Sequence, residues 1–201
     1  MRLKKLHSRS DPEFPTTWQI YEAGFPPDQR QTREQQKPRF ALPEYRWEAI
    51  IEGNEIIGVL ETWRFPRFVY VDHIAIKESC RDKGYGQKIL KGIIDSGKIV
   101  VGESELPADD FAKRRFAFYG RLGLRANPFS YVMPPYSPEK KPVPYIIVSS
   151  PRQLTHEEFV DVRKALHLVV YGQKVFIPEG ASHTGSSYTA DTAPEARRRA
   201  R

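Results

Sequence analysis

Three apolar runs of strand length follow one another between residues 45 and 77: YRWEAIIEG, EIIGVLETWRF and FVYVDHIAIK. Turn-forming residues at 52–55 separate the first two runs, and Pro66-Arg67 separates the second from the third. The pattern therefore predicts three consecutive antiparallel strands. Along the third strand a period of two places Tyr70, Asp72, Ile74 and Ile76 on one face, and Val71, His73 and Ala75 on the other.

The third run leads through the turn KESCRDKGYG into a stretch with apolar residues at helical spacing. Ile89, Leu90, Ile93 and Ile94 share one face of this predicted helix, and Gly97 is placed to cap its end. The next run, KIVVGESE, reads as a buried strand. A strand, helix and strand in succession predict a right-handed crossover and a parallel strand pair.

Further helices and strands flank this unit. TTWQIYEAGF predicts a helix capped by Thr16 or Thr17 and ended by Gly24, and DDFAKRRFAFYGRLGL predicts one ended by Gly123. FSYVMPPY and VPYIIVSS read as a final strand pair. The expected fold is α/β (α+β): a mixed, mostly antiparallel twisted sheet flanked by helices, with a central strand-turn-helix unit.

The last helix is predicted at about 155–171, because THEE opens a capping box and an amphipathic pattern follows. Its apolar face needs cover, either from its own domain or from a second copy in a homodimer. Residues 1–175 are expected to form a single domain. Residues 176–201 are small and polar without apolar periodicity, which predicts a disordered tail.

Composition supports a folded, cytoplasmic protein. Of the 201 residues 39% are hydrophobic, yet no stretch is apolar enough to span a bilayer and the start lacks the apolar core of a signal peptide, so no membrane association is expected. Cys80 is the only cysteine, which excludes an internal disulfide and a multi-cysteine metal site. No metal is expected.

The net charge of +7 suits a nucleic acid, a membrane surface or a polyanionic small molecule. Basic residues are scattered, and no aromatic residues alternate with them to form a base-stacking platform. Nucleic acid is therefore not expected as a partner.

The glycine-containing turn is the strongest candidate for a small anionic ligand. A strand that passes through such a turn into a helix presents free backbone N–H groups and the positive end of the helix dipole, both of which favour phosphate. Gly84 and Gly86 allow close approach, while Arg81, Lys83 and Lys88 add positive charge. The turn has neither the spacing of a P-loop nor the three glycines of a dinucleotide fingerprint. The alternative is a tight backbone turn without a ligand.

RDKGYG at Arg81–Gly86 resembles the [RQ]-x-x-G-x-[GA] motif of the GNAT family of N-acetyltransferases, and FAFYGRLGL is similar to the family's FYxxxGF signature. The resemblance covers about Trp18 to Ser149 and implies acetyl-coenzyme A as co-substrate. It also implies that the following residues bind the cofactor, the first three through backbone groups to the pantetheine arm and the others around the pyrophosphate: Ile74, Ala75, Ile76, Arg81, Asp82, Lys83, Gly84, Tyr85, Gly86 and Gln87.

The resemblance gives catalytic roles to three residues. Tyr119 is expected beside the coenzyme A sulfur, where it protonates the leaving thiolate. Asp72 is the first choice for the base; its alternative is a structural ion pair, since a carboxylate in so apolar a strand must be paired or functional. Glu103, ranked above Glu105, is the further candidate for relaying the amine proton, and His73 is either catalytic or a hydrogen-bonded core residue.

The implied function is an acyltransferase that moves an acetyl group from acetyl-coenzyme A to a primary amine, on a small molecule or a peptide, by direct transfer in a ternary complex. Two departures from the family pattern, Ala112 for a frequent asparagine and Arg115 for a small residue, concern the pantetheine side. The alternative is a non-catalytic acyl-coenzyme A sensor of the same fold. Cys80 precedes the motif but has no adjacent histidine, which favours a structural thiol over a nucleophile.

Overall fold

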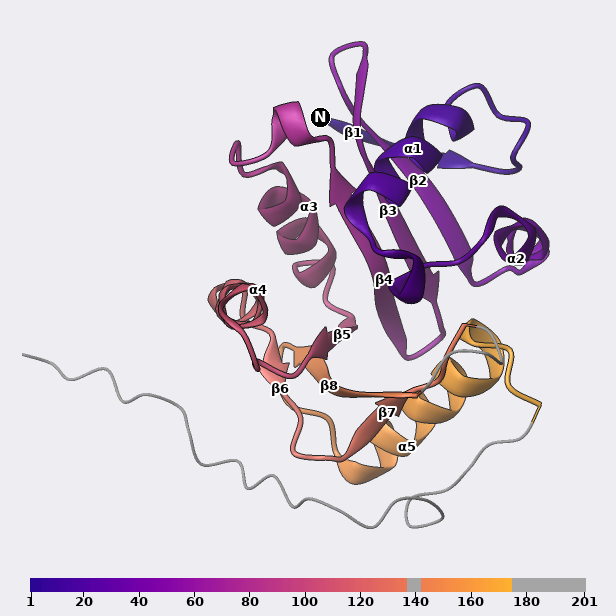
Figure 1. Ribbon diagram of the computed structural model, residues 1–201. Coiled ribbons are helices and arrows are strands. Elements are labelled where there is room, and N and C mark those ends of the chain that lie inside the picture. Colours follow the sequence, from indigo (N-terminus) through magenta and orange to yellow (C-terminus); the bar gives the residue numbers. More distant parts are fainter. Residues whose placement is uncertain (137–141, 175–201) are drawn as a thin grey trace, which may run out of the picture.

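The computed structural model describes residues 1–136 and 142–174, which form one mixed sheet with helices packed on it (Figure 1). The strands are β1 (Arg2–Leu6), β2 (Tyr45–Glu52), β3 (Glu55–Arg64), β4 (Phe68–Ile76), β5 (Ile99–Glu105), β6 (Arg125–Ala126), β7 (Tyr131–Met133) and β8 (Val143–Ser150). The helices are α1 (Phe14–Gly24), α2 (Arg33–Gln36), α3 (Tyr85–Ile94), α4 (Asp110–Arg121) and α5 (His156–Ala165). The predicted tail at 176–201 lies outside the described residues.

The sheet runs in the order β1-β2-β3-β4-β5-β8-β6, with β7 also paired to β8. The strands β2, β3 and β4 form the predicted antiparallel meander, and β4 and β5 form the predicted parallel pair. Strand β1, which pairs antiparallel with β2, was not predicted. Its sequence RLKKL is short and mostly exposed, with only Leu6 buried, so it carries little apolar pattern.

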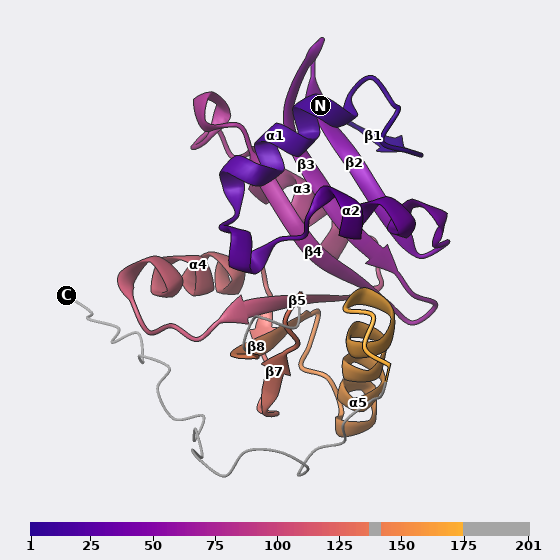
Figure 2. The same cartoon turned by 45° about the vertical axis from the view of Figure 1, so that its right-hand side comes forward.

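The pairing of β4 with β5 stops halfway along β4. It extends from Phe68 opposite Ile99 to Val71 opposite Gly102, after which β5 continues only with β8 on its other side. The two strands then diverge, as Figure 2 shows. One edge of β4 from residue 72 onward is therefore left without a strand partner, at the level where Asp72 and Glu103 follow the last paired residues.

A β-bulge lies in β4 at the same level. The register passes from His73 opposite Glu61 to Val71 opposite Thr62, so Asp72 is the extra residue. The predicted alternation of faces is consequently wrong at this point. Asp72 and His73 turn to the same side of the sheet, with Nδ1 of His73 3.0 Å from Oδ1 of Asp72.

Beyond the bulge the faces are exchanged relative to the prediction. Ala75 lies beneath Gly24 of α1, whereas Ile74 and Ile76 pack on the cluster that contains Ile89 of α3. The side of the sheet that carries Asp72 is thus the α1 side.

Helix α1 begins at Phe14, earlier than predicted, so neither Thr16 nor Thr17 caps it. The Thr17 side chain is instead buried, where its hydroxyl donates to the Phe14 carbonyl and accepts from the Trp47 indole. The end of the helix at Gly24 is as predicted.

Helix α5 packs against its own chain. The predicted capping box between Thr155 and Glu158 is present, and Phe159, Val162 and Leu166 are buried in the same core cluster as α1. The helix then continues as a π-helical turn, Leu166–Val170. Its apolar face is thus covered within the chain.

Candidate active site

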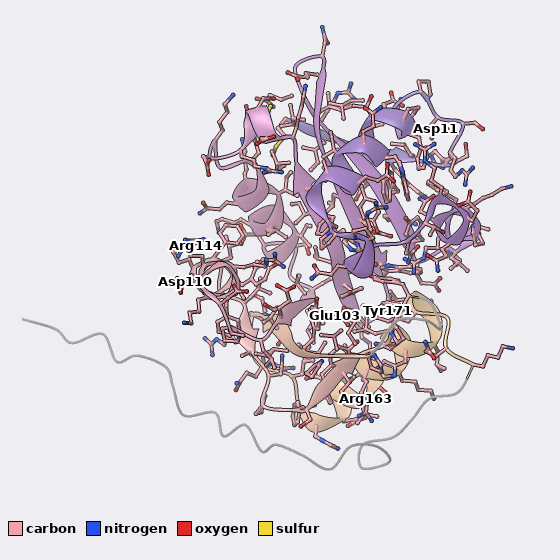
Figure 3. All side chains as sticks on the ribbon, in the orientation of Figure 1. Asp11, Glu103, Asp110, Arg114, Arg163 and Tyr171 are labelled. Carbon is pink, nitrogen blue, oxygen red and sulfur yellow. The ribbon has the colours of Figure 1, made fainter. Side chains whose placement is uncertain are left out.

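Glu103 lies at the mouth of the opening between β4 and β5, half-buried beneath tyrosines. Its carboxylate accepts hydrogen bonds from the hydroxyls of Tyr70 (2.8 Å), Tyr131 and Tyr171 (2.5 Å). Figure 3 shows Glu103 and Tyr171 close together, although Glu103 belongs to β5 and Tyr171 follows the π-helical turn that extends α5 (together, the α5 segment). Burial raises the pKa of Glu103 to about 7, and the negative charge of Asp72 adds to the rise, while the tyrosine hydroxyls oppose it. A carboxyl group that titrates near neutrality can accept a proton and release it again.

Asp72 lies on the other side of the opening in a closed network of charges. Its Oδ2 is 3.6 Å from the Arg39 guanidinium and accepts from the Trp63 indole at 3.1 Å. Arg39 also contacts Oε1 of Glu61 at 3.3 Å and lies over the Trp63 ring at 4.9 Å. The hydroxyl of Tyr70 connects this network to Glu103 and its tyrosines, since it is 3.3 Å from Asp72 and 2.8 Å from Glu103.

His73 completes the network as a cation. Its Nδ1 lies 2.8 Å from Glu61 and 3.0 Å from Asp72, and its Nε2 lies 2.9 Å from the Gln29 carbonyl. Because both ring nitrogens face acceptors, the ring must carry both protons. The two carboxylates raise the pKa of His73 to about 10 against the effect of burial, and His73 and Arg39 in turn lower the pKa of Asp72.

A carboxylate oxygen of Glu61, a carboxylate oxygen of Asp72 and a ring nitrogen of His73 lie within 4.8 Å of one another. This spacing suits a cation. Arg39 supplies that cation. With His73 protonated, two positive and two negative groups balance inside the core, which is the condition for burying charge at acceptable cost.

Tyr119 of α4 lies near the far end of β5. It is half-buried, and desolvation raises its pKa, while the charge of Arg115 lowers the pKa and that of Glu105 raises it. Among the described residues its hydroxyl has no hydrogen-bond partner. Glu105 pairs with Arg115 at 3.3 Å and accepts from the side-chain amide of Gln29 at 2.5 Å. Gln29 therefore joins β4 to β5 across the opening.

The predicted phosphate-binding turn precedes α3. Asp82 and Gly84 have positive φ angles of 61° and 75°, and Gly84 is the N-cap of the helix without a side-chain cap. The first N–H groups of α3 consequently point out of the helix unshielded, with the exposed side chains of Arg81 and Lys83 beside them. The arrangement suits a diphosphate.

The open edge of β4 leads from this turn toward Asp72. The N–H of Lys77 bonds to Ile57 of β3, so by alternation the backbone groups of Ala75 also face β3, and those of Ile74 and Ile76 face the open edge. In keeping with this, the Ile76 carbonyl accepts from Arg81 Nε at 3.2 Å. The geometry thus favours Ile74 and Ile76 over Ala75 as backbone partners of an extended ligand.

Sequence reasoning missed much of what surrounds the predicted residues. Arg39, Glu61, Tyr131 and Tyr171 were not singled out, although each contacts Asp72, His73 or Glu103. Glu61 had a local signal, because it is a carboxylate inside the apolar run EIIGVLETWRF. The others come from a short 3-10 helix, a short strand and the end of a π-helical turn, where nothing in the local pattern marks them.

The comparison with known families agrees with this geometry. The model of the acetyltransferase (GNAT) family matches residues 4–124, which is more than half of the chain. The chain belongs to the GNAT acetyltransferase family. It is thus an acyltransferase by family, and the match contains both the turn before α3 and Tyr119. Among curated proteins, none matches the chain.

Solved structures of GNAT acetyltransferases share the fold. A GNAT-family acetyltransferase from Bacteroides thetaiotaomicron is 26% identical, with a TM-score of 0.80 over 87% of this chain and 100% of its own. A Bacillus subtilis acetyltransferase in complex with CoA is 14% identical, with a TM-score of 0.50 over 77% of this chain and 99% of its own. An Elizabethkingia anophelis GNAT acetyltransferase with acetyl-CoA bound is also 14% identical, with a TM-score of 0.51 over 74% of this chain and 95% of its own.

The described part of the GNAT chain includes no helix with the length and apolar character needed to cross a membrane.

Proposed function

We propose that the protein is an acetyl-coenzyme A-dependent N-acetyltransferase that acts on a primary amine, of a small molecule or a peptide, by direct transfer in a ternary complex. The observation that carries the proposal is the opening between β4 and β5. It is lined by a carboxyl group with a pKa near 7, Glu103, and Tyr119 lies near its far end. Residues 1–175 would act as one domain.

The coenzyme would bind along the line from the α3 turn to the opening. The N–H groups of residues 84–87 and the side chains of Arg81 and Lys83 would hold the diphosphate, and the open edge at Ile74 and Ile76 would pair with the pantetheine amides. Ala112 is buried, and Arg115 pairs with Glu105, so the two departures from the family pattern leave the turn itself intact.

Glu103 is a better base than Asp72. Asp72 contacts Arg39 and His73, which hold its pKa below the usual value and leave it a weak proton acceptor. Glu103 has a pKa of about 7, close to the value that favours proton transfer in neutral solution. We therefore assign the base to Glu103, and to Asp72 the role of holding Tyr70 and His73 in place.

The proposed reaction uses these groups in order. Glu103, directly or through a water molecule, takes one proton from the substrate ammonium, and the free amine attacks the thioester carbonyl carbon. The C–N bond forms and the C–S bond breaks, Tyr119 gives its proton to the leaving sulfur, and the attacking nitrogen returns a proton to Tyr119. The products are the amide, free thiol and one released proton.

Cys80 does not take part in this scheme. It is buried with Ile50, Leu60 and Ile89 in the cluster beneath α3, on the opposite side of the sheet from Asp72. A covalent acetyl-cysteine step would need a thiolate that faces the opening.

Calorimetric titration with acetyl-coenzyme A tests the cofactor assignment. Gly86→Glu places a carboxylate in the first turn of α3, where a Cβ meets only Ile76 at an ordinary 3.8 Å. Gly92→Glu makes the same change two turns later, where a Cβ meets nothing within 4 Å. We expect clear binding by wild type and by Gly92→Glu, and at least a hundredfold weaker binding by Gly86→Glu.

Equal affinities for the two variants would refute the turn as the diphosphate site, and no binding by wild type would refute the proposed function. A panel of primary amines with detection of the released thiol then tests transfer. Binding of acetyl-coenzyme A without turnover of any amine would favour a sensor.

A further inference from the structure

Two of the three hydroxyls that hold Glu103 come from chain segments beyond the residues that the family model matches. Tyr70 belongs to β4, but Tyr131 lies in β7 and Tyr171 follows α5, both after residue 124. The C-terminal part of this chain therefore reaches the proposed catalytic carboxylate.

The end of the α5 segment is shaped to deliver Tyr171. The helix widens into a π-turn, in which the Tyr171 N–H bonds to the Leu166 carbonyl at 2.9 Å. Leu166 and Val170 are buried on its inner side. The Val170 carbonyl also accepts from Arg39 at 2.5 Å, which ties the turn to the charge network around Asp72.

We propose that Tyr171 is a positioning residue that fixes the orientation of the Glu103 carboxylate and stabilises its ionised form through the donated hydrogen bond. The proposal rests on the proposed function, in which Glu103 is the base. It makes the π-turn after α5 a part of the active site and not only a part of the core.

Hydroxyl donors surround the Glu103 carboxylate. Ionised carboxylates only accept hydrogen bonds, and Glu103 receives three hydroxyl donors in a site that is only partly open to water. Removing one donor weakens the ionised form more than the neutral form, so the affinity of Glu103 for its proton rises. The titratable groups that act on Glu103 or face it are Tyr70, Asp72, Tyr131, Tyr136, Tyr145 and Tyr171.

The test compares full-length wild type with Tyr171→Phe in the pH profile of kcat/KM for acetyl transfer. The substitution keeps the aromatic ring, which lies 5.2 Å from the Tyr136 ring, and removes only the hydroxyl. The midpoint of urea unfolding shows whether the variant is folded. On the acid side of the profile, kcat/KM falls as Glu103 becomes protonated. Because the variant loses one hydrogen bond to a charged group, we expect this acid limb to move upward by about one to two pH units. The position of the acid limb decides the test, because the base is ionised on the alkaline plateau with or without the Tyr171 hydroxyl.

Tyr136→Phe is the matched control. Its hydroxyl is directed to Asp72 at 3.5 Å and not to Glu103, so the acid limb should stay at the wild-type position. A limb that stays in place in Tyr171→Phe, or that moves equally in both variants, would overturn the proposal and leave Tyr171 a packing residue.

A second measurement separates failure of this proposal from failure of the proposed function. The carboxyl carbon of Glu103 is titrated by NMR in carbon-13-labelled protein, with Glu103→Gln to identify its signal. An upward shift of the midpoint in Tyr171→Phe supports the positioning role even if the acceptor amine is not found, and an unchanged midpoint refutes it. Full transfer activity in Glu103→Gln would instead refute the assignment of the base.

Discussion

Replacing Arg39 by methionine tests whether the buried charges form one balanced network. Arg39 has 8% of its surface exposed and contacts Glu61 at 3.3 Å and Asp72 at 3.6 Å. Methionine fills much of the same space but leaves two buried carboxylates with His73 as their one remaining cation among the groups described above.

The size of the effect follows from burial. Removing one partner from a buried ion pair costs about 3–5 kcal/mol, a large share of the 5–15 kcal/mol that stabilises a typical domain. We expect a loss in this range in urea unfolding at pH 7. The loss should shrink as the pH falls, because unpaired buried carboxylates take up protons more readily.

Two further variants control the result. Arg67→Met removes a guanidinium that is 64% exposed and 3.0 Å from Asp161, itself 51% exposed, so the expected loss is below about 1 kcal/mol. Arg39→Lys keeps the charge without the planar fork and should lie between the two. If Arg39→Met lost no more stability than Arg67→Met, the balanced-network account would be refuted.

Three further predictions concern pH, the acid and the thiol. The pKa of His73 is raised from 6.5 to about 10, so the stability it contributes is complete below pH 6.5 and is lost as the pH rises toward 10. The urea midpoint of the wild type should therefore fall over this range, by an amount equivalent to a few kcal/mol. The midpoint of His73→Gln should not fall, and a wild-type midpoint that rises would contradict the network. Tyr119→Phe should lower kcat by about 10²–10³-fold with little change in the urea midpoint, because no described residue bonds the hydroxyl; unchanged kcat would exclude Tyr119 as the acid. Cys80→Ala should retain most activity, and a loss above about a hundredfold, roughly 2.7 kcal/mol of barrier, would point to a nucleophilic thiol.

Local chemistry made part of this molecule predictable. The three strands before the turn, the turn with Gly84 and Gly86, the helix after it and the capping box at Thr155 were all predicted correctly. Each is decided by residues adjacent in sequence: an apolar run bounded by turn residues, a glycine with positive φ, or a side chain that bonds three residues away. Residues that carry the family resemblance lie in the same local motifs.

The surroundings of the candidate catalytic groups depended on contacts between distant residues. The bulge at Asp72 turned His73 to the same side of the sheet, and a period of two cannot reveal it because the extra residue is defined by the partner strand. Arg39 meets Asp72, and Tyr171 meets Glu103, across 33 and 68 positions of sequence respectively.

The sequence by itself therefore determined most of the elements, the glycine-containing turn before α3 and the residue types available for proton transfer. Only the tertiary structure decided which carboxylate is neutralised by cations and which lies beneath tyrosine hydroxyls. The physical reason is that a pKa is set by desolvation and by the charges that folding brings near, and neither is encoded within a few residues of Asp72 or Glu103.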